Sequence, residues 1–291
     1  MRAYNYRLLN VFALEGRPLS GNPLCVFEDA RGLDTQTMQA LALQFNLSET
    51  TFILPSDCAT AQVRIFTPNF EMPFAGHPTL GTAQVVRELC GTGDALTLQM
   101  QAGVIPVTAQ QNNWKLQANA PTWRPVTANA LQLAAMLGLH SDEVQATPLW
   151  VNAGSEQLVV PLRDVSAVQR CEPKLALLKQ HAGLTEQRFL VYVWAHRNAE
   201  EIEARFFFAK GSAVAEDPAT GSACANLGGW FIANNTELPV SKRIMQGAAV
   251  GRPSVLNLYV GTPVPNLHDD TQSRIFVSGQ VIELGRGLIN L

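Results

Sequence analysis

The sequence predicts an α/β protein built from two similar halves, and two observations support this fold class. Segments with strand-like and helix-like periodicity are interleaved along the whole chain of 291 residues. An Arg-x-Phe strand also occurs twice, at Arg64 and Arg205, and each copy continues through a loop into a helix that starts with small residues. No linker separates the copies. The repeated segments are short, and alone they are a weak sign of duplication.

The first half is expected to begin with two strands, a helix and a third strand. Residues 6–13 alternate in polarity like a strand, and residues 24–27 form a second one. Asp34 caps the helix and Asn46 ends it, and residues 47–54 lead into the third strand. The apolar face of the helix consists of Met38, Leu41, Ala42 and Phe45.

A second helix is expected to start at Gly76-His77-Pro78, after a buried strand at 63–67 and a proline-rich loop. Proline suits the first turn because its missing N–H costs no helical hydrogen bond there. Gly91 ends this helix at about Cys90. Three short strands follow, near 96–99, 103–108 and 114–118.

The pattern begins again after Pro121. The segment 207–215 is interpreted as part of a polar, glycine-rich loop that leads to a second small-residue helix start at Thr220-Gly-Ser. We expect a helix at 129–137, a helical stretch broken by Pro173, and strands at 158–162, 189–194, 204–208, 255–260, 274–277 and 280–284.

Composition narrows the function classes. The net charge is −3 and no basic run occurs, so nucleic acid is not an expected partner. Charged residues make up only 15% of the chain, below the roughly 25% that is typical, so part of the surface is expected to be neutral or buried against a partner subunit.

The location is expected to be cytoplasmic. The start of the chain lacks the apolar stretch of a signal peptide, and no apolar run is long enough to span a membrane. The five cysteines are scattered and form no C-x-x-C pair, which fits a reducing compartment. Motifs for nucleotide, flavin and metal binding are missing, so we expect no cofactor and no metal.

The two small-residue helix starts are the most informative local feature. Small residues let a ligand approach the unpaired backbone N–H groups of a helix start, where the helix dipole favours an anion. Close packing of a buried helix explains the same residues equally well. His77 lies in the first turn of its helix, where a neutral imidazole is expected, either as a ligand-contacting group or as a packing residue.

Glu49 stands between a helix and a hydrophobic strand. A single glutamate at such a place is usually solvated, but Leu47, Phe52 and Ile53 indicate a buried segment. Burial would raise the pKa of its carboxyl group toward neutrality, where one group can both take and return a proton. Asp217 and Ser222, near the second helix start, fit either turn and capping chemistry or ligand binding.

Several long motifs resemble the PhzF-like family of phenazine-biosynthesis isomerases. The resemblance covers nearly the whole chain. It rests on Gly21-Asn-Pro, Leu47-Ser-Glu-Thr-Thr-Phe, Arg64-Ile-Phe-Thr-Pro, Pro73-Phe-Ala-Gly-His-Pro-Thr-Leu-Gly-Thr-Ala, Glu216-Asp-Pro-Ala-Thr-Gly-Ser-Ala, Gln246-Gly, Gly251-Arg-Pro-Ser and Val277-Ser-Gly.

The resemblance implies a diaminopimelate-epimerase-like fold with two pseudo-symmetric halves. Each half is a curled, mostly antiparallel sheet around a central helix, with the active site in the cleft between them and a homodimer as the usual assembly. On this basis, 1–119 is one half, which carries Glu49 and His77, and a C-terminal strand at about 278–291 returns to it. The other half is 120–277, which carries Asp217 and Ser222.

The resemblance also implies a mechanism. In the phenazine enzyme, which isomerises trans-2,3-dihydro-3-hydroxyanthranilate, one glutamate moves a proton between two carbons, and Glu49 matches it. His77 and Asp217 match its supporting residues. Ser222 and the backbone N–H groups at Gly76 and Gly221 are then expected to bind a small carboxylate substrate.

Two alternatives remain at this point. Phe207-Phe-Ala-Lys departs from the family pattern Phe-Ser-Pro, so a metabolite-binding protein with little turnover is a second hypothesis. A thiol racemase is a third, but Ala75 and Thr220 stand at or near the places where related racemases carry cysteines. Cys224 lies about one turn too late to replace them.

Overall fold

The structure, a computed structural model, describes residues 2–145, 147–185, 188–262 and 274–291. The chain divides into two compact units. Unit 1 comprises Met1–Gln117 and Ser278–Leu291, and unit 2 comprises Ala118–Val277.

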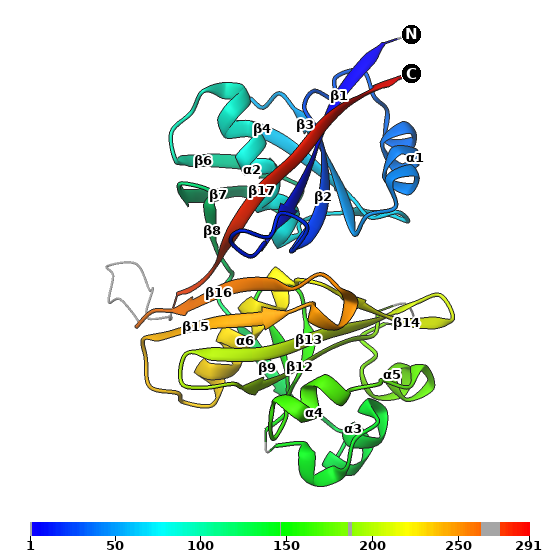
Figure 1. The fold of residues 1–291 in the computed structure, drawn as a ribbon, viewed down its shortest axis with the longest axis vertical. Helices are drawn as coiled ribbons and strands as arrows, with labels where there is room; N and C mark the ends of the chain where they lie inside the picture. The colour runs from blue at the N-terminus through cyan, green and yellow to red at the C-terminus, as the bar shows by residue number, and fades with distance from the viewer. Residues whose placement is uncertain (1, 146, 186–187, 263–273) are drawn as a thin grey trace. The chain divides into compact units, whose positions relative to one another are not determined.

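Unit 1 is a sheet closed around one helix (Figure 1). The strand pairings run β17–β1–β2–β3–β4–β6–β7–β8, and β8 pairs with β17, so the sheet closes on itself. Of the described registers, β2–β3 and β4–β6 are parallel and the others antiparallel. The strands are β1 (Ala3–Val11), β2 (Asn22–Phe27), β3 (Glu49–Leu54), β4 (Ala61–Phe66), β5 (Glu71–Met72), β6 (Ala95–Met100), β7 (Gly103–Gln110), β8 (Asn113–Gln117) and β17 (Ile275–Asn290).

Helix α2 (Gly76–Cys90) is enclosed by this sheet and contacts β1, β2, β3, β4, β6 and β8. Every residue from Gly76 to Val86 is buried. A Cβ on Gly81 would lie 2.4 Å from Leu24 Cδ2, so a larger residue would push the helix off the strand. Close packing therefore explains part of the small-residue pattern. Helix α1 (Thr35–Phe45) lies on the other face of β3 and β4, begins at Asp34 and ends at Asn46, as predicted.

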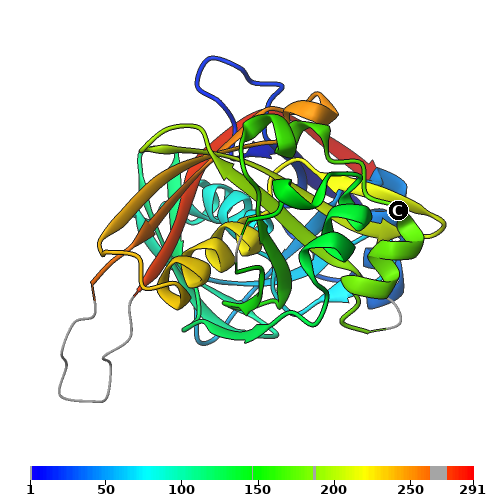
Figure 2. The same cartoon turned by 90° about the horizontal axis from the view of Figure 1, so that it is seen from below.

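Unit 2 repeats this plan around helix α6 (Gly221–Ala233), drawn in yellow in Figure 2. Helix α6 contacts β9, β10, β11 and β16. The pairings run β9–β10–β11–β12–β13–β15–β16, and β14 pairs with β13. The strands are β9 (Thr122–Pro125), β10 (Leu149–Asn152), β11 (Gln157–Pro161), β12 (Leu190–His196), β13 (Glu201–Lys210), β14 (Ala213–Asp217), β15 (Val240–Gln246) and β16 (Ser254–Val260).

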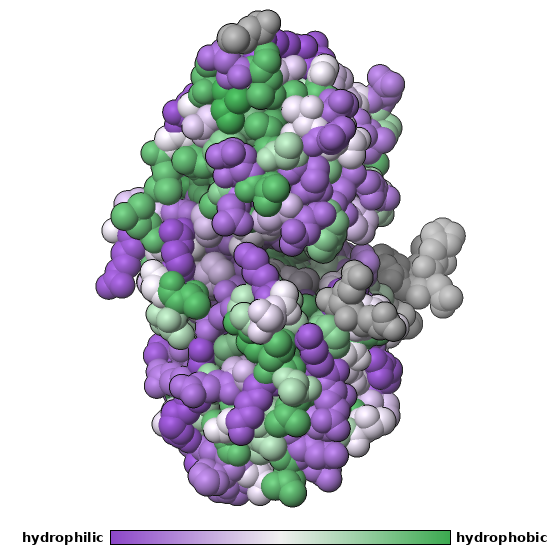
Figure 3. Space-filling model, turned by 90° about the vertical axis from the view of Figure 1, so that its right-hand side faces the viewer, coloured by the Kyte–Doolittle hydropathy of each residue, from purple (hydrophilic) through white to green (hydrophobic). Residues whose placement is uncertain are grey.

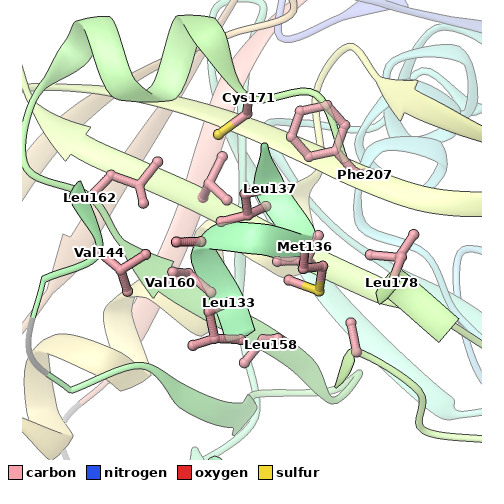
Figure 4. Packing of buried hydrophobic residues seen from close by; sticks show 14 of the residues in the cluster. Leu133, Met136, Leu137, Val144, Leu158, Val160, Leu162, Cys171, Leu178 and Phe207 are labelled. Atoms are coloured by element: carbon pink, nitrogen blue, oxygen red, sulfur yellow. The ribbon is translucent and has the colours of Figure 1, made fainter. Parts of the chain in front are cut away.

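A cluster of buried hydrophobic residues in unit 2 lies between three short helices and the sheet (Figure 4). Side chains of these helices converge with Leu158 and Val160 of β11 and with Phe207 of β13. Removal of these apolar side chains from water stabilises the packing of the three helices on the sheet that contains the Arg205 strand. The helices are α3 (Ala130–Leu137), α4 (Val165–Arg170) and α5 (Leu175–His181).

The internal repeat seen in the sequence is present in the topology. From β1 to β7 and from β10 to β16, neighbouring strands pair in the same order of antiparallel and parallel contacts. In each unit the arginine of the Arg-x-Phe strand pairs with a glutamate of the next strand, Arg64 with Glu71 and Arg205 with Glu216. Each guanidinium also lies over the phenylalanine two residues later. The predicted fold class is confirmed.

Two predicted segments are wrong. Residues 207–215 are mostly strand, because β13 extends to Lys210 and turns at Gly211, φ +62°, into β14. Val214 is the only β-branched residue between Lys210 and Asp217, and the glycine and small residues around it are typical of a loop. The strands expected at 274–277 and 280–284 are one strand, β17. Gly279 lets it cross the ring of Phe12, which a Cβ would approach to 2.3 Å. Strands β9, β10 and β15 were not predicted.

The surface is mixed in character. On the face drawn in Figure 3, hydrophobic and hydrophilic residues alternate over short distances. None of the helices in the described part of the chain is long and apolar enough to cross a membrane.

Helix α3 provides a matched test of the core of unit 2. Leu133→Ala should lower the free energy of unfolding by about 2–5 kcal/mol, because Leu133 is 0% exposed and its truncation leaves a cavity. Leu131→Ala, on the same helix at 66% exposure, should change it by less than about 0.5 kcal/mol. Urea unfolding followed by tryptophan fluorescence measures this, since Trp123, Trp150, Trp194 and Trp230 all belong to unit 2. Equal effects of the two changes would contradict the assigned core.

Candidate active site

Glu49 is the first residue of β3 and lies opposite Leu24 of the parallel strand β2. Its side chain is 15% exposed, whereas Thr50, Thr51 and Phe52 after it are buried. The segment is buried as expected, and Oε2 of Glu49 is buried too, although the side chain as a whole keeps a small exposed fraction. Such a position suits a group that must meet a ligand and still be desolvated by it.

His77 is the second residue of α2, and its side chain is only 6% exposed. The imidazole is hydrogen-bonded to the carbonyl of Pro23, and its Nε2 lies 3.5 Å from Oε2 of Glu49. Burial lowers the pKa of His77 to about 3, although the Pro23 carbonyl opposes that change. His77 is therefore neutral at pH 7. The sequence also led to a neutral imidazole, but desolvation rather than the helix dipole is the main cause.

The hydrogen bond to Pro23 fixes which nitrogen of His77 carries the proton. Nε2 forms no hydrogen bond within the described structure, so Nδ1 is the atom that donates to the carbonyl of Pro23. In a neutral imidazole, Nε2 is then an acceptor that faces Glu49.

The Gly21-Asn22-Pro23 motif places that carbonyl. Gly21 has φ +82°, and a Cβ there would lie 2.6 Å from the carbonyl oxygen of Val11. The glycine thus lets the chain turn close to β1, so that Pro23 enters β2 opposite Asn10. The sequence marked this motif only as part of a family resemblance. Its role in orienting His77 could not be found without the structure.

Asp217 is the last residue of β14, three residues before the N-cap of helix α6. Its Oδ2 accepts a hydrogen bond from the hydroxyl of Thr220. The side chain of Gln246 donates to the backbone carbonyl of Asp217 at 2.9 Å and to Thr220 Oγ1 at 3.2 Å. Gly247, φ +79°, leaves room for Pro218, whose carbonyl a Cβ would approach to 2.4 Å. The Gln246-Gly247 pair thereby shapes the turn that leads into α6.

Ser222 is the second residue of α6, the position that His77 occupies in α2. Its Oγ accepts a hydrogen bond of 2.9 Å from Nε2 of Gln157. Gln157 is in turn bound to the buried Asn226. The structure thus brings Glu49 and His77 together in unit 1, and gathers Asp217, Gly221 and Ser222 at one helix start in unit 2.

Both of these helix starts lack a side-chain cap. Within the described residues, neither Ala75 before Gly76 nor Thr220 before Gly221 forms a side-chain hydrogen bond to its own helix start. Helices α1, α3 and α4 are capped by Asp34, Asn129 and Asp164, whereas α5 also lacks a side-chain cap. First-turn N–H groups that no side chain caps can be used by an anionic ligand.

Thiol chemistry has little support in this arrangement. Ala75 and Thr220 occupy the N-caps of the two enclosed helices, and neither carries a thiol. Cys224 is buried, and burial raises the pKa of its thiol well above the usual range, so it stays protonated. As for metals, no group of three or more His, Cys, Asp or Glu in residues 2–145, 147–185, 188–262 and 274–291 could hold an ion.

Comparison with known proteins identifies the family. The profile of the phenazine biosynthesis-like protein family, PhzC-PhzF, matches residues 9–287. The chain belongs to this family. A trans-2,3-dihydro-3-hydroxyanthranilate isomerase of Pseudomonas chlororaphis is 32% identical over 99% of this chain and 100% of its own. An uncharacterized isomerase of Pasteurella multocida is 38% identical over 98% of this chain and 93% of its own. The predicted enzyme class, isomerase, is therefore confirmed.

Solved structures agree with the fold. A PhzF-family protein of Bacillus anthracis superposes with a TM-score of 0.86 at 22% identity, and the match covers 100% of both chains. A hydroxyproline epimerase of Agrobacterium vitis superposes with a TM-score of 0.62 at 9% identity, over 100% of this chain and 93% of its own. At these identities the likeness concerns the fold alone, which this family shares with amino-acid epimerases.

The protonation of His77 gives a direct test of the geometry. In ¹⁵N-detected NMR spectra, His77 should stay neutral with the proton on Nδ1 from pH 8 down to about pH 4.5, because burial holds its pKa near 3. An unfolded histidine takes up its proton near pH 6.5, so folding stability contributed by neutral His77 should be lost as pH falls from about 6.5 toward 3.

The stability part of this test compares variants. Each unit of difference between the folded and unfolded pKa corresponds to about 1.4 kcal/mol. His77→Gln should remove the part of the acid sensitivity that His77 causes, whereas His181→Gln on helix α5 should leave it unchanged. A His77 resonance that titrates near pH 6.5 would contradict the buried, neutral assignment.

Proposed function

We propose that this isomerase moves a proton between two carbon atoms of a small carboxylic acid without a cofactor, with Glu49 as the general acid and base. The substrate class is a cyclic or unsaturated amino or hydroxy acid. The observation that carries the proposal is the position of Glu49, whose buried Oε2 lies 3.5 Å from Nε2 of a neutral imidazole that can only accept a hydrogen bond there.

The chemistry needs one group that takes and returns a proton. Ionised Glu49 removes a proton from one carbon, and the electron pair of the broken C–H bond spreads over the neighbouring double bond and carboxylate. Protonated Glu49 then delivers the proton to a second carbon, so the double bond shifts and the enzyme returns to its starting state. General acid–base catalysis of this kind contributes about 10²–10⁴-fold to rate.

His77 has a specific role in this cycle. A protonated Glu49 can donate a hydrogen bond to Nε2, while an ionised Glu49 gains no hydrogen bond from it. The pair thus favours the protonated half of the cycle, after the substrate has lost its proton. A distance of 3.5 Å is long for such a bond, and contacts of this kind often shorten only when a substrate is present.

Unit 2 supplies groups that suit a carboxylate. The N–H groups at Gly221 and Ser222 begin a helix without a side-chain cap, and Gly76 offers the same in unit 1. Asp217 accepts from Thr220 and orients the polar part of the substrate, such as an amino or hydroxyl group. We propose these residues as the binding groups, together with the hydroxyl of Ser222.

The substrate is proposed to be similar to that of the Pseudomonas relative, which is named for trans-2,3-dihydro-3-hydroxyanthranilate. The β13–β14 hairpin, with Phe208 and Lys210 near its turn, departs from the family pattern just before Asp217. We therefore expect this protein to share the proton transfer with the Pseudomonas relative, whereas its substrate can differ.

Replacement of Glu49 tests the mechanism. Glu49→Gln keeps the shape of the side chain but removes the base, so turnover should fall by at least about 10²-fold. The measurement is incorporation of deuterium from solvent into trans-2,3-dihydro-3-hydroxyanthranilate and into a panel of β,γ-unsaturated amino and hydroxy acids, followed by NMR. Glu15→Gln, at an exposed position of the same unit, should leave the rate unchanged.

The outcomes separate the competing functions. Exchange in the wild type that disappears in Glu49→Gln excludes a protein that only binds metabolites. Full exchange in Glu49→Gln would contradict the mechanism. Rapid loss of activity with a thiol alkylator that tracks Cys224 would instead favour a thiol racemase.

We also propose that the protein works as a homodimer. Only 15% of its residues are charged, and several large apolar side chains are exposed, among them Leu284 and Leu288 on β17. Burial of such residues against a second copy would remove apolar surface from water. Light scattering at micromolar concentration should give twice the chain mass of 31.7 kDa, and a monomeric mass would contradict this assembly.

A cytoplasmic location is proposed from the thiols. All five cysteines are free, two of them exposed, which suits a reducing compartment. Cell fractionation that recovered the protein outside the cytosol would contradict this.

A further inference from the structure

We propose that Gln157 and Asn226 are positioning residues that fix the hydroxyl of Ser222 as a hydrogen-bond donor, so that the ligand group bound there must be an acceptor such as an ionised carboxylate. This inference rests on the proposed role of Ser222 in substrate binding. The backbone fixes the direction of the hydrogen bonds of Asn226, which fixes that of Gln157 and then that of Ser222.

The chain of hydrogen bonds starts at Asn226, which is fully buried in α6. Its Oδ1 accepts from the backbone N–H of Ala153 at 2.8 Å, and its Nδ2 donates to the carbonyl of Ser155 at 2.8 Å. A backbone N–H can only donate and a carbonyl can only accept, so both contacts fix the same orientation of the Asn226 amide.

The orientation of the Asn226 amide determines that of the Gln157 amide. Nδ2 of Asn226 also donates to Oε1 of Gln157 at 2.9 Å, which leaves the Nε2 end of Gln157 facing Ser222. Gln157 is buried as well, so reversal of its amide would set its NH₂ group against the NH₂ group of Asn226 without water to separate them.

Ser222 stands at the end of this chain. Its oxygen accepts from Gln157 at 2.9 Å, so its own proton is directed elsewhere, toward a ligand at the start of α6. The hydroxyl therefore adds one directed donor to the backbone N–H groups beside it. A carboxylate satisfies such donors, whereas the NH₂ face of a carboxamide does not.

The repeat shows that the fold itself does not require this amide pair. Gly81 and Asn226 are each the sixth residue of the helix enclosed by their unit. In unit 1 the contact at this place is apolar, between Gly81 and Leu24 of β2. Unit 2 has buried amides where unit 1 has an aliphatic contact, and the hydrogen bonds of these amides lead to Ser222, a proposed binding residue. Gln157 and Asn226 therefore have a role in addition to packing, which is to orient Ser222.

The test compares two stable probes, anthranilate and its carboxamide anthranilamide, by calorimetric titration. The wild type should bind anthranilate more tightly than anthranilamide. Gln157→Glu replaces the donor by an acceptor, so Ser222 should turn its proton toward residue 157. Affinity for anthranilate should then fall by about 10-fold or more, the effect of one hydrogen bond to a charged group, and the preference for anthranilate should narrow or reverse.

Matched variants distinguish polarity from packing. Gln157→Met keeps the length of the side chain but removes its polarity, and it should reduce the preference for anthranilate over anthranilamide without reversing it. This variant keeps the test decisive if Gln157→Glu does not fold. Ser222→Ala should remove most of the preference. A ratio of the two affinities that stays unchanged in Gln157→Glu and Gln157→Met, even if both affinities fall, would overturn the inference. Equal binding of both probes by the wild type would overturn it too, while the isomerase proposal still depends on Glu49→Gln.

Discussion

The enclosure of a helix by its own sheet is the constraint on which both units depend. Strands that contact α2 on several sides leave room only for small side chains at the crossing points, as Gly81 against Leu24 shows. The N-cap of this helix is Ala75, which has no side chain able to cap the first turn. We propose that the small residues serve two purposes, since they allow close packing and leave the first-turn N–H groups accessible to an anion.

The two enclosed helices present opposite polarities at equivalent positions. In α2, the proton of His77 is committed to the carbonyl of Pro23, and an acceptor atom is left facing Glu49. In α6, the oxygen of Ser222 is committed to Gln157, and a donor is left. A duplicated scaffold has in this way acquired one start that suits an acid/base group and another that suits an anion. Neither role depends on the second residue of the helix alone, because the neighbouring strand decides which atom remains available.

Much of this organisation could be predicted from the sequence because local signals carry it. Helix α1 was located from Asp34 and Asn46, and the repeat from two Arg-x-Phe strands. The β13–β14 hairpin was missed because its second strand has one β-branched residue, Val214, among small and acidic residues, although it pairs regularly with β13. The partners of the site residues were missed for another reason. Pro23 lies 54 residues before His77, and Gln157 lies 65 before Ser222, so only the fold relates them. That one cleft contains both helix starts stays a prediction.

The last strand has a consequence for how the protein is made. The N–H of Arg2 donates to the carbonyl of Leu291, and β1 lies between β2 and β17 in the closed sheet of unit 1. During synthesis all of unit 2 therefore leaves the ribosome before the strand that completes unit 1. Unit 1 must wait with an open sheet edge beside β1, the kind of edge on which unfinished chains aggregate. The unit that begins first is thus completed last, because the strand that closes its sheet follows all of unit 2 in the chain.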